Sequence, residues 1–473
     1  MAEFRFERDS MGEMRVPADA YYGAQTARAV ENFPISARRM PRRMIAALGL
    51  VKLAAAEANR SLGLLDAQRA GWIVQAAGEV VAGVHDGQFV VDVFQTGSGT
   101  SSNMNANEVI AGRANELAGR PRGGKAPVHP NDHVNLGQSS NDVFPTAMHL
   151  AVAMAVRDEL VPALSRLEQR LGAGVTRFDE VVKVGRTHLQ DATPIRVGQV
   201  FGGYTQQARY AVERSLRAVV ALCELPLGGT AVGTGINAHP EFAGRAIAEL
   251  AGRTGLSVRE AVNHVEAQAA RDAVLEASGL LRTAAASLMR IANDIRFLAS
   301  GPRCGIGELL LPAVQPGSSI MPGKVNPVMC EMLMMASARM FAADTAVQTC
   351  ALMGSNFELN VMMPLMAWEL LDAVSILSRA TAVFTERCVA GIDVDRVRCA
   401  SLVEQSLAMC TALAPHIGYD AAAELARAAY ESGRTVREVA RERRVLPEHQ
   451  LELLLDPLRM TSPQADMIGP GGG

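Results

Sequence analysis

The chain has 473 residues, a formal net charge of −3 at pH 7, 49% hydrophobic residues and only 4% aromatic residues. A core of Ala, Leu, Val and Met suits packed helices, and this length permits two or three domains or one extended helical architecture. The balanced charge, without a long run of Lys or Arg, argues against nucleic acid or an anionic membrane as a partner.

The cysteines and the N-terminus indicate a cytoplasmic protein. Seven cysteines are dispersed without a CxxC pair, which is typical of reduced thiols. Residues 1–9 alternate charge and lack an apolar core, so no secretory signal is expected. The most apolar stretches, 143–164 and 325–353, are interrupted by charges, so we expect no membrane span.

Residues 1–138 are predicted to form a loop-rich N-terminal domain. Helical patterns occur in three places, at residues 44–62, 67–84 and 105–117. Glycine-rich and serine-rich clusters between them, at 96–99 and 121–124, are typical of turns.

Residues 139–393 change to long helical patterns and are predicted to form a central helical bundle. The patterns cover residues 147–171, 197–222 and 274–298 and the stretches that follow Asn326 and Pro364. The third pattern has an apolar seam stepping by three and four residues, made of Val274, Ala277, Leu281, Ala284, Leu288, Ile291, Ile295 and Leu298. Such a seam packs side by side against other helices.

Residues 394–473 are predicted to form a small C-terminal helical domain, with helices at 421–431 and 435–444 and a disordered tail at 469–473. The fold class is therefore all-α with three domains. Helices that are apolar on most faces must bury more than one face. A bundle that packs against other subunits satisfies this requirement, and a large monomeric all-α protein remains the alternative.

Four polar blocks interrupt the helical sequence. They are residues 97–103, residues 129–132 leading to 138–141, residues 185–188, and the loop 317–327 with Glu331 beyond it. His129 and His133 have metal-pair spacing, but Pro130 keeps them from sharing a helix. No phosphate loop or cysteine cluster accompanies the blocks, so neither a metal nor an organic cofactor is predicted.

The loop 317–327 is rich in Gly, Pro and Ser and leads into a helix that Asn326 and Pro327 can start. The residues after it place Cys330, Leu333, Met334, Ala338 and Phe341 on one apolar face. Glycines, the helix N-terminus and Lys324 together favour an anion as the guest. A plain connecting loop is the simpler interpretation.

Each of the other blocks also has a simpler interpretation. Ser139, Ser140 and Asn141 could form only a helix N-cap. His188 could be a buried core histidine, and Glu331 could lie on a solvated helix face.

The loop sequence GSSIMPGKVNP resembles the signature loop of the fumarase/aspartase superfamily, and all four blocks are similar to those of class II fumarases. This resemblance implies an all-α homotetramer, without metal or organic cofactor, that reversibly hydrates fumarate to L-malate in the tricarboxylic acid cycle. It also implies that each active site combines blocks from three subunits.

The resemblance also assigns roles by motif. Ser318 matches the catalytic base, His188 the histidine on the proton-transfer path, and Glu331 its partner. The dicarboxylate-binding positions are Ser98, Gly99, Thr100, Ser139, Ser140, Asn141, Thr187, Ser319, Lys324, Val325 and Asn326. His129, Pro130, Asn131 and Asp132 resemble a second, non-catalytic anion site.

These residue types suit the reaction. Proton removal beside a carboxylate creates a dianionic intermediate, which donors such as Lys324, Asn326 and loop N–H groups can stabilise. A serine acts as a base only where its alkoxide is stabilised, as Ser318 would be near Lys324 and a helix start. Histidine, the side-chain type that titrates near neutrality, suits protonation of the leaving hydroxide.

Other functions remain open. Aspartate ammonia-lyases share the loop but usually carry Gln at the position of His188, and His133 also occurs in them. Departures from the fumarase pattern at Leu136, Gly137, Val200, Met362 and Met363 leave a lyase of a related C4 dicarboxylate possible. A non-catalytic helical scaffold is opposed by the presence of Ser318 and the other chemically demanding residues.

Overall fold

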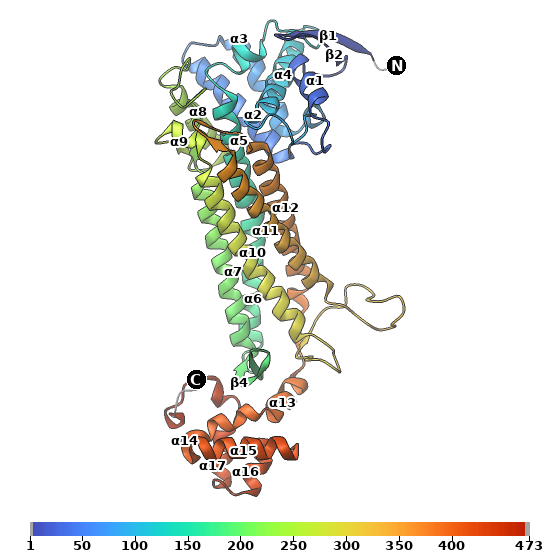
Figure 1. Ribbon diagram of the computed structural model, residues 1–473, viewed down its shortest axis with the longest axis vertical. Coiled ribbons are helices and arrows are strands. Elements are labelled where there is room, and N and C mark those ends of the chain that lie inside the picture. Colours follow the sequence, from blue (N-terminus) through green and yellow to red (C-terminus); the bar gives the residue numbers. More distant parts are fainter. Residues whose placement is uncertain (1–2, 469–473) are drawn as a thin grey trace. The chain divides into compact units, whose positions relative to one another are not determined.

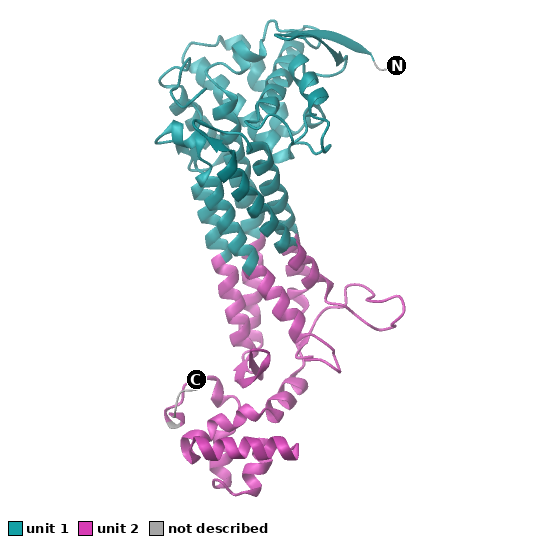
Figure 2. Cartoon of the chain, viewed as in Figure 1, with its two compact units in different colours: residues 1–162, 211–286, 336–379 teal, residues 163–210, 287–335, 380–473 magenta. Residues whose placement is uncertain are grey.

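The computed structural model describes residues 3–468, so the predicted disordered tail at 469–473 lies outside the described residues. Contacts divide the chain into two compact units (Figure 2). Unit 1 comprises residues 1–162, 211–286 and 336–379, and unit 2 comprises residues 163–210, 287–335 and 380–473. The three domains predicted with boundaries at 138 and 393 divide the chain differently and stay a prediction.

Unit 1 packs helices around an alanine-rich core, with a β-hairpin made of β1 and β2 (Figure 1). Its elements are β1 (Phe4–Asp9), β2 (Gly12–Pro17), α1 (Ala24–Asn32), α2 (Arg42–Ser61), α3 (Ala67–Ala82), α4 (Thr100–Leu117), α5 (Ser140–Ala155), β5 (Glu224–Leu225), α8 (Phe242–Thr254), β6 (Arg259–Glu260), α9 (His264–Ala269), β8 (Ser355–Asn356) and β9 (Leu359–Asn360).

Five long helices are divided between the two units. They are α6 (Val161–Arg177), α7 (Val197–Ala221), α10 (Asp272–Leu298), α11 (Val328–Gly354) and α12 (Met363–Arg387). Within unit 1, Asp344 of α11 accepts hydrogen bonds from Ser278 and Arg282 of α10. Within unit 2, Arg290 of α10 donates to Gln207 of α7. The long helices therefore pack laterally inside each unit.

Unit 2 contains a second hairpin and the C-terminal helices. Its other elements are β3 (Val182–Thr187), β4 (Gln190–Arg196), β7 (Leu309–Leu310), β10 (Asp393–Val394), α13 (Arg396–Gln405), α14 (Ala414–Ile417), α15 (Tyr419–Ser432), α16 (Val436–Glu442) and α17 (Glu448–Leu454). Every sheet in the described chain has only two strands. Helices therefore carry the architecture, which confirms the all-α prediction.

The long-helix predictions are confirmed with small shifts. The pattern at 147–171 is the largest exception, because the structure begins the helix at Ser140 and inserts a π-helical segment, Val156–Leu160, between α5 and α6. Both hairpins were missed, because their strands are only six or seven residues long and their apolar alternation is weak.

The apolar seam predicted for α10 is buried from Val274 to Ile295, and Leu298 is half-buried. The apolar face predicted for α11 is covered only in part within this chain. Cys330 and Leu333 are buried, but Ala338 is exposed and Phe341 half-buried. Because α11 is apolar on most faces, its sequence does not single out the side that the rest of the chain covers.

In the part of the chain that the structure describes, no helix combines the length and the apolar character needed to cross a bilayer.

Candidate active site

A tight turn places the first polar block at the start of α4. Gly99 has φ +76°, and a Cβ there would lie 2.1 Å from the Phe144 ring, so only glycine fits. The Oγ of Ser98 lies 2.8 Å from Oγ1 of Thr100, the first residue of α4. Two hydroxyl groups are thereby held at a helix N-terminus, where partial positive charge favours anions.

The second polar block starts α5. Ser139 is the N-cap, and its capping box is closed by Asp142, whose Oδ1 accepts the Ser139 N–H at 2.9 Å. Asp142 Oδ2 accepts two more backbone N–H groups, from Gly228 and Thr230. Burial nevertheless raises the pKa of Asp142 to about 6. The Asn141 amide donates to the Ala231 carbonyl.

One hydrogen bond joins the two blocks. Nδ2 of the buried Asn103, in the first turn of α4, donates to Oγ of Ser140 at 3.0 Å. The N-termini of α4 and α5 therefore meet inside unit 1. Two helix starts with several hydroxyl and amide groups make a site suited to a carboxylate.

The third block, predicted only as an interruption of helix, forms the tip of the β3–β4 hairpin. His188 and Leu189 have φ of 57° and 61°, and Thr187 pairs with Gln190 across the turn. Consecutive positive φ values are typical of a two-residue hairpin turn. Thr187 and His188 are exposed, so the interpretation of His188 as a core histidine is wrong.

A buried carboxylate fixes this hairpin. Glu308 is fully buried, and its carboxylate accepts hydrogen bonds from Arg186 Nη1 at 2.8 Å and Nη2 at 3.1 Å. Nζ of the buried Lys183 lies 3.2 Å from the same carboxylate. Burial lowers the pKa of Lys183. Arg186 directly precedes Thr187, so its ion pair with Glu308 fixes the strand residue next to the hairpin tip.

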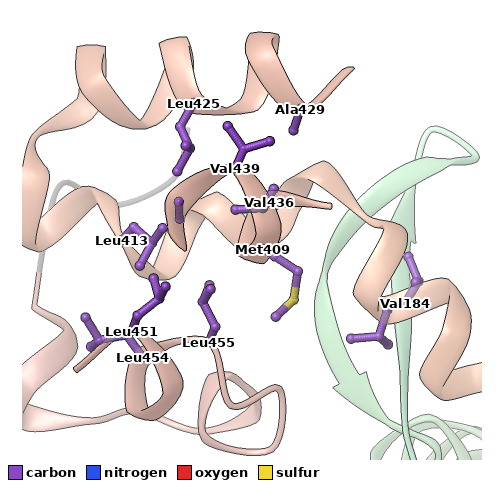
Figure 3. Close-up of a cluster of buried hydrophobic side chains, with 12 residues drawn as sticks. Val184, Met409, Leu413, Leu425, Ala429, Val436, Val439, Leu451, Leu454 and Leu455 are labelled. Carbon is purple, nitrogen blue, oxygen red and sulfur yellow. The ribbon is translucent and has the colours of Figure 1, made fainter. Parts of the chain in front are cut away.

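An apolar cluster attaches the hairpin to the C-terminal helices (Figure 3). Val184 of β3 is buried together with Met409, Leu413 and apolar residues of α15, α16 and α17. At Gly185 a Cβ would lie 2.4 Å from the Thr193 carbonyl oxygen, at the point where the strand register shifts. The hairpin therefore packs on the region that the sequence assigns to a separate C-terminal domain.

The loop 317–327 holds Ser318 in a defined environment. Its Oγ accepts backbone N–H groups from Ile320 at 3.3 Å and from Met321 at 3.1 Å. The Asn326 amide donates to the Gly317 carbonyl at 2.9 Å and closes the loop at its base. The helix starts at Val328, one residue later than predicted, and the Pro327 carbonyl accepts from Glu331 N–H.

Other predicted residues of this block are open to solvent in the described chain. Ser319, Lys324 and Val325 are exposed in the loop, and Glu331 is exposed in the first turn of α11. His188 and Glu331 thus stand on separate elements of unit 2, and their predicted partnership stays a prediction.

The block at 129–132 forms its own turn. His129 caps a short π-helix, Pro130–Val134, and its Nδ1 accepts N–H groups from Asn131 and Asp132 at 3.1 Å each. Nδ1 of His133 accepts the His129 N–H at 2.8 Å, and burial lowers the pKa of His133. The structure thus gives this block a local structural role, and a second anion site stays a prediction.

The departures from the fumarase pattern lie around these blocks. Met363 is buried, and its backbone N–H donates to the Gly97 carbonyl at 3.0 Å. The Leu136 carbonyl accepts from Asn59, and Gly137 has φ +71°. Met362 is 38% exposed and Val200 half-buried. Met363 and Leu136 therefore make these hydrogen bonds through backbone atoms, and other residue types at these positions would make them too.

Three polar residues that hydrogen-bond to these blocks or to the turn before α5 were not singled out as site residues from the sequence: Asn103, Glu308 and Lys52. Each is a polar residue in an otherwise apolar or hydroxyl-rich stretch, as in the run Gly49-Leu50-Val51-Lys52-Leu53-Ala54-Ala55. A single charged residue on a buried helix face is the signal that could have identified Lys52.

Comparisons with known proteins agree over the whole chain. Residues 12–342 match a family model described as "Lyase", and residues 409–462 match one described as "Fumarase C C-terminus". The class II fumarate hydratase of Nitrosomonas europaea is 50% identical over 98% of this chain and 100% of its own. That of Halobacterium salinarum is 54% identical over 97% of each chain. The crystal structure of class II fumarase from Schistosoma mansoni is 40% identical, with a TM-score of 0.94 over 97% of this chain and 99% of that one.

Proposed function

Because this chain belongs to the class II fumarases of the fumarase/aspartase superfamily, we propose that it is a hydro-lyase that reversibly adds water to fumarate to give L-malate. The observation that carries this proposal is the identity of about half of all positions with class II fumarate hydratases over essentially the whole chain. The tricarboxylic acid cycle is the metabolic setting, and the cytoplasm is the proposed location.

The joined N-termini of α4 and α5 supply the proposed recognition of a substrate carboxylate. Hydroxyl groups of Ser98, Thr100 and Ser140 lie at these helix starts. A helix N-terminus presents unpaired N–H groups and partial positive charge. Lys324 and Asn326 of the loop are the proposed donors to the second carboxylate.

Ser318 is the proposed base for the carbon-bound proton of L-malate. A serine hydroxyl is ordinarily too weakly acidic to work as an alkoxide. The two backbone N–H groups on Ser318 Oγ would stabilise a negative oxygen there, as in an oxyanion hole. In this scheme Ser318 takes the proton, and the electron pair left on carbon passes into the neighbouring carboxylate until the C–O bond breaks.

His188 is proposed to protonate the departing hydroxide, directly or through water, with Glu331 behind it. Loss of hydroxide as water leaves fumarate, and the reverse sequence hydrates it. The hairpin tip presents the imidazole in the open, so the group is free to face a substrate held by another copy of the chain.

We further propose a homotetramer in which three chains contribute to each active site. Helix α11 keeps large apolar side chains exposed, including Met335 at 68%, Leu352 at 72% and Met353 at 70%. On α7, Val220 is 63% exposed. Burying such side chains against other subunits is favourable by roughly 1.5–3 kcal/mol each, which is a driving force for assembly of the bundle helices.

The test is the ultraviolet absorbance of fumarate, with L-malate and L-aspartate supplied separately to the purified protein. Fumarate from L-malate alone is the expected result. Fumarate from L-aspartate alone would assign the chain to the ammonia-lyases, and no reaction with either would favour a related C4 acid or a scaffold. Full activity after treatment with a chelator is expected, because no metal is proposed.

A further inference from the structure

We propose that Lys52 is a positioning residue for substrate binding, holding the α5 start and Asn103 in register through a buried hydrogen-bond network. This inference rests on the proposed function, because it assigns the role to the carboxylate-binding side of the site. Lys52 lies on α2, far in sequence from both segments that it holds.

The side chain of Lys52 is completely buried and directed at the segment before α5. Its Nζ donates to Oδ1 of Asn135 at 2.7 Å and to Oε1 of Gln138 at 3.0 Å. Both acceptors are neutral amides, so neither offsets the full charge of an ammonium group. A buried cation with such partners is costly, which is a reason to look for a role beyond packing.

Asn135 connects Lys52 to the proposed binding site. Its Oδ1 also accepts Nδ2 of Asn103 at 3.3 Å and Nδ2 of Asn107 at 3.2 Å. Asn103 uses the same Nδ2 group to donate to Oγ of Ser140. The ammonium of Lys52 is therefore two hydrogen-bonded side chains away from a proposed substrate-binding hydroxyl.

Gln138 anchors the same segment from its other side. The Gln138 carbonyl accepts from Nδ2 of Asn135 at 3.1 Å, while its side-chain amide donates to the carbonyls of Val134 and Leu136. From α2, Asn59 also donates to the Leu136 carbonyl at 2.9 Å. Removing Lys52 takes one donor from the half-buried Asn135 and one from the half-buried Gln138, at the two ends of the turn that delivers Ser139 and Ser140.

The charge itself is suited to the ligand. Burial lowers the pKa of Lys52 to about 7, and the nearby carboxylate of Asp142 opposes this shift. In its protonated form, Lys52 adds to the positive potential that a dicarboxylate meets at the joined helix N-termini. A methionine of similar length would fill the space but would donate no hydrogen bond.

The main test is Lys52→Met in the full-length protein. In the proposed function Ser140 contacts substrate in both the ground state and the transition state. Its displacement should therefore weaken substrate binding, and raise KM, without slowing the chemical step. We expect KM for L-malate to rise about 10- to 100-fold, as for the loss of a charged hydrogen-bond anchor, and kcat to stay within about threefold. Asn135→Ala, which keeps the lysine but removes its acceptor, should change KM in the same direction.

The matched control is Met44→Ala, also a fully buried residue of α2. It creates a cavity without touching the network, so it should lower the melting temperature but leave KM unchanged. Equal KM values for Lys52→Met and wild type would overturn the inference, and so would a rise in KM in Met44→Ala of the same size.

Hydrogen–deuterium exchange without substrate separates this inference from the proposed function. Peptides covering residues 134–142 should exchange faster in Lys52→Met and Asn135→Ala than in wild type or Met44→Ala. If wild type does not convert L-malate, the proposed function fails while the exchange result still decides the positioning role. Unchanged exchange in both network variants would refute that role.

Discussion

The two units prepare their parts of the proposed site in different ways. In unit 1, Asn103 and Ser140 are joined directly and are supported by buried groups on α2 and α4. In unit 2, His188 stands exposed on a hairpin tip, and Ser318 lies in a loop whose hydrogen bonds are mostly internal. The proposed binding side is therefore organised within one chain, whereas the proposed proton-transfer side presents its groups to the outside.

This difference has a physical reason. A carboxylate site must hold several neutral donors in fixed directions, and burial in a hydrogen-bonded network provides that rigidity. A group that transfers protons must reach the substrate and then release product, which favours loops and hairpin tips. Exposure of His188 and Glu331 in the single chain is also what a site completed by other subunits requires.

The largest expected effect is that of Ser318→Ala. Without the proposed base, kcat should fall about 10²- to 10⁴-fold, while the mass of the assembly measured by light scattering stays unchanged. Ser432→Ala, an exposed serine of α15, should behave as wild type in the fumarate absorbance assay. Near-normal turnover in Ser318→Ala would remove this loop from the chemistry.

Glu308→Gln should be the most damaging change to the support of the hairpin. It leaves the buried Lys183 and the half-buried Arg186 without their carboxylate, and breaking a buried ion pair in this way costs about 3–5 kcal/mol. Urea unfolding would report the loss as a lower midpoint. The surface pair of Glu448 with Arg441 provides the control, because Glu448→Gln should leave the midpoint unchanged. A midpoint unchanged in both variants would contradict the anchoring role.

His188→Asn tests the hairpin tip without straining it. Asn accepts positive φ more readily than most residues, so the turn should persist while the imidazole is lost. We expect kcat to fall about 10²-fold with an unchanged melting temperature. Leu189→Asn, at the next positive-φ position, should retain activity. If both variants lost activity equally, the turn conformation rather than the imidazole would be responsible.

The smallest expected effect, counted per pH unit, is a pH dependence of stability due to Lys52. Its pKa is about 7 in the folded chain against 10.5 for an unperturbed lysine, so above pH 7 the unfolded chain binds more protons than the folded one. The free energy of unfolding should therefore rise between pH 7 and about 10.5, by at most about 1.4 kcal/mol per pH unit.

Melting curves of wild type and Lys52→Met at pH 7, 8 and 9 measure this rise. Groups that titrate alike in both proteins cancel in the difference. The stability of wild type relative to Lys52→Met should increase as pH rises, and a constant difference would show that the lysine keeps its proton throughout this range.

Much of the fold follows from local sequence. The α10 seam predicts its own burial, and the polar blocks mark the starts of α4, α5 and α11, because capping residues and helical spacing act over a few residues. The hairpin at 182–196 does not follow in this way. Its short strands are stabilised by Val184 packing among C-terminal residues and by Glu308, more than 100 residues away.

The sequence by itself therefore determined the long helices, the four blocks and, through their motifs, the family. Only the tertiary structure decided that Lys52 lies beneath Asn135, 83 positions along the chain, that Asn103 meets Ser140, and which face of α11 is covered. The reason is that a motif records what neighbouring residues can do, whereas the partner of a buried charge is chosen by packing between distant segments.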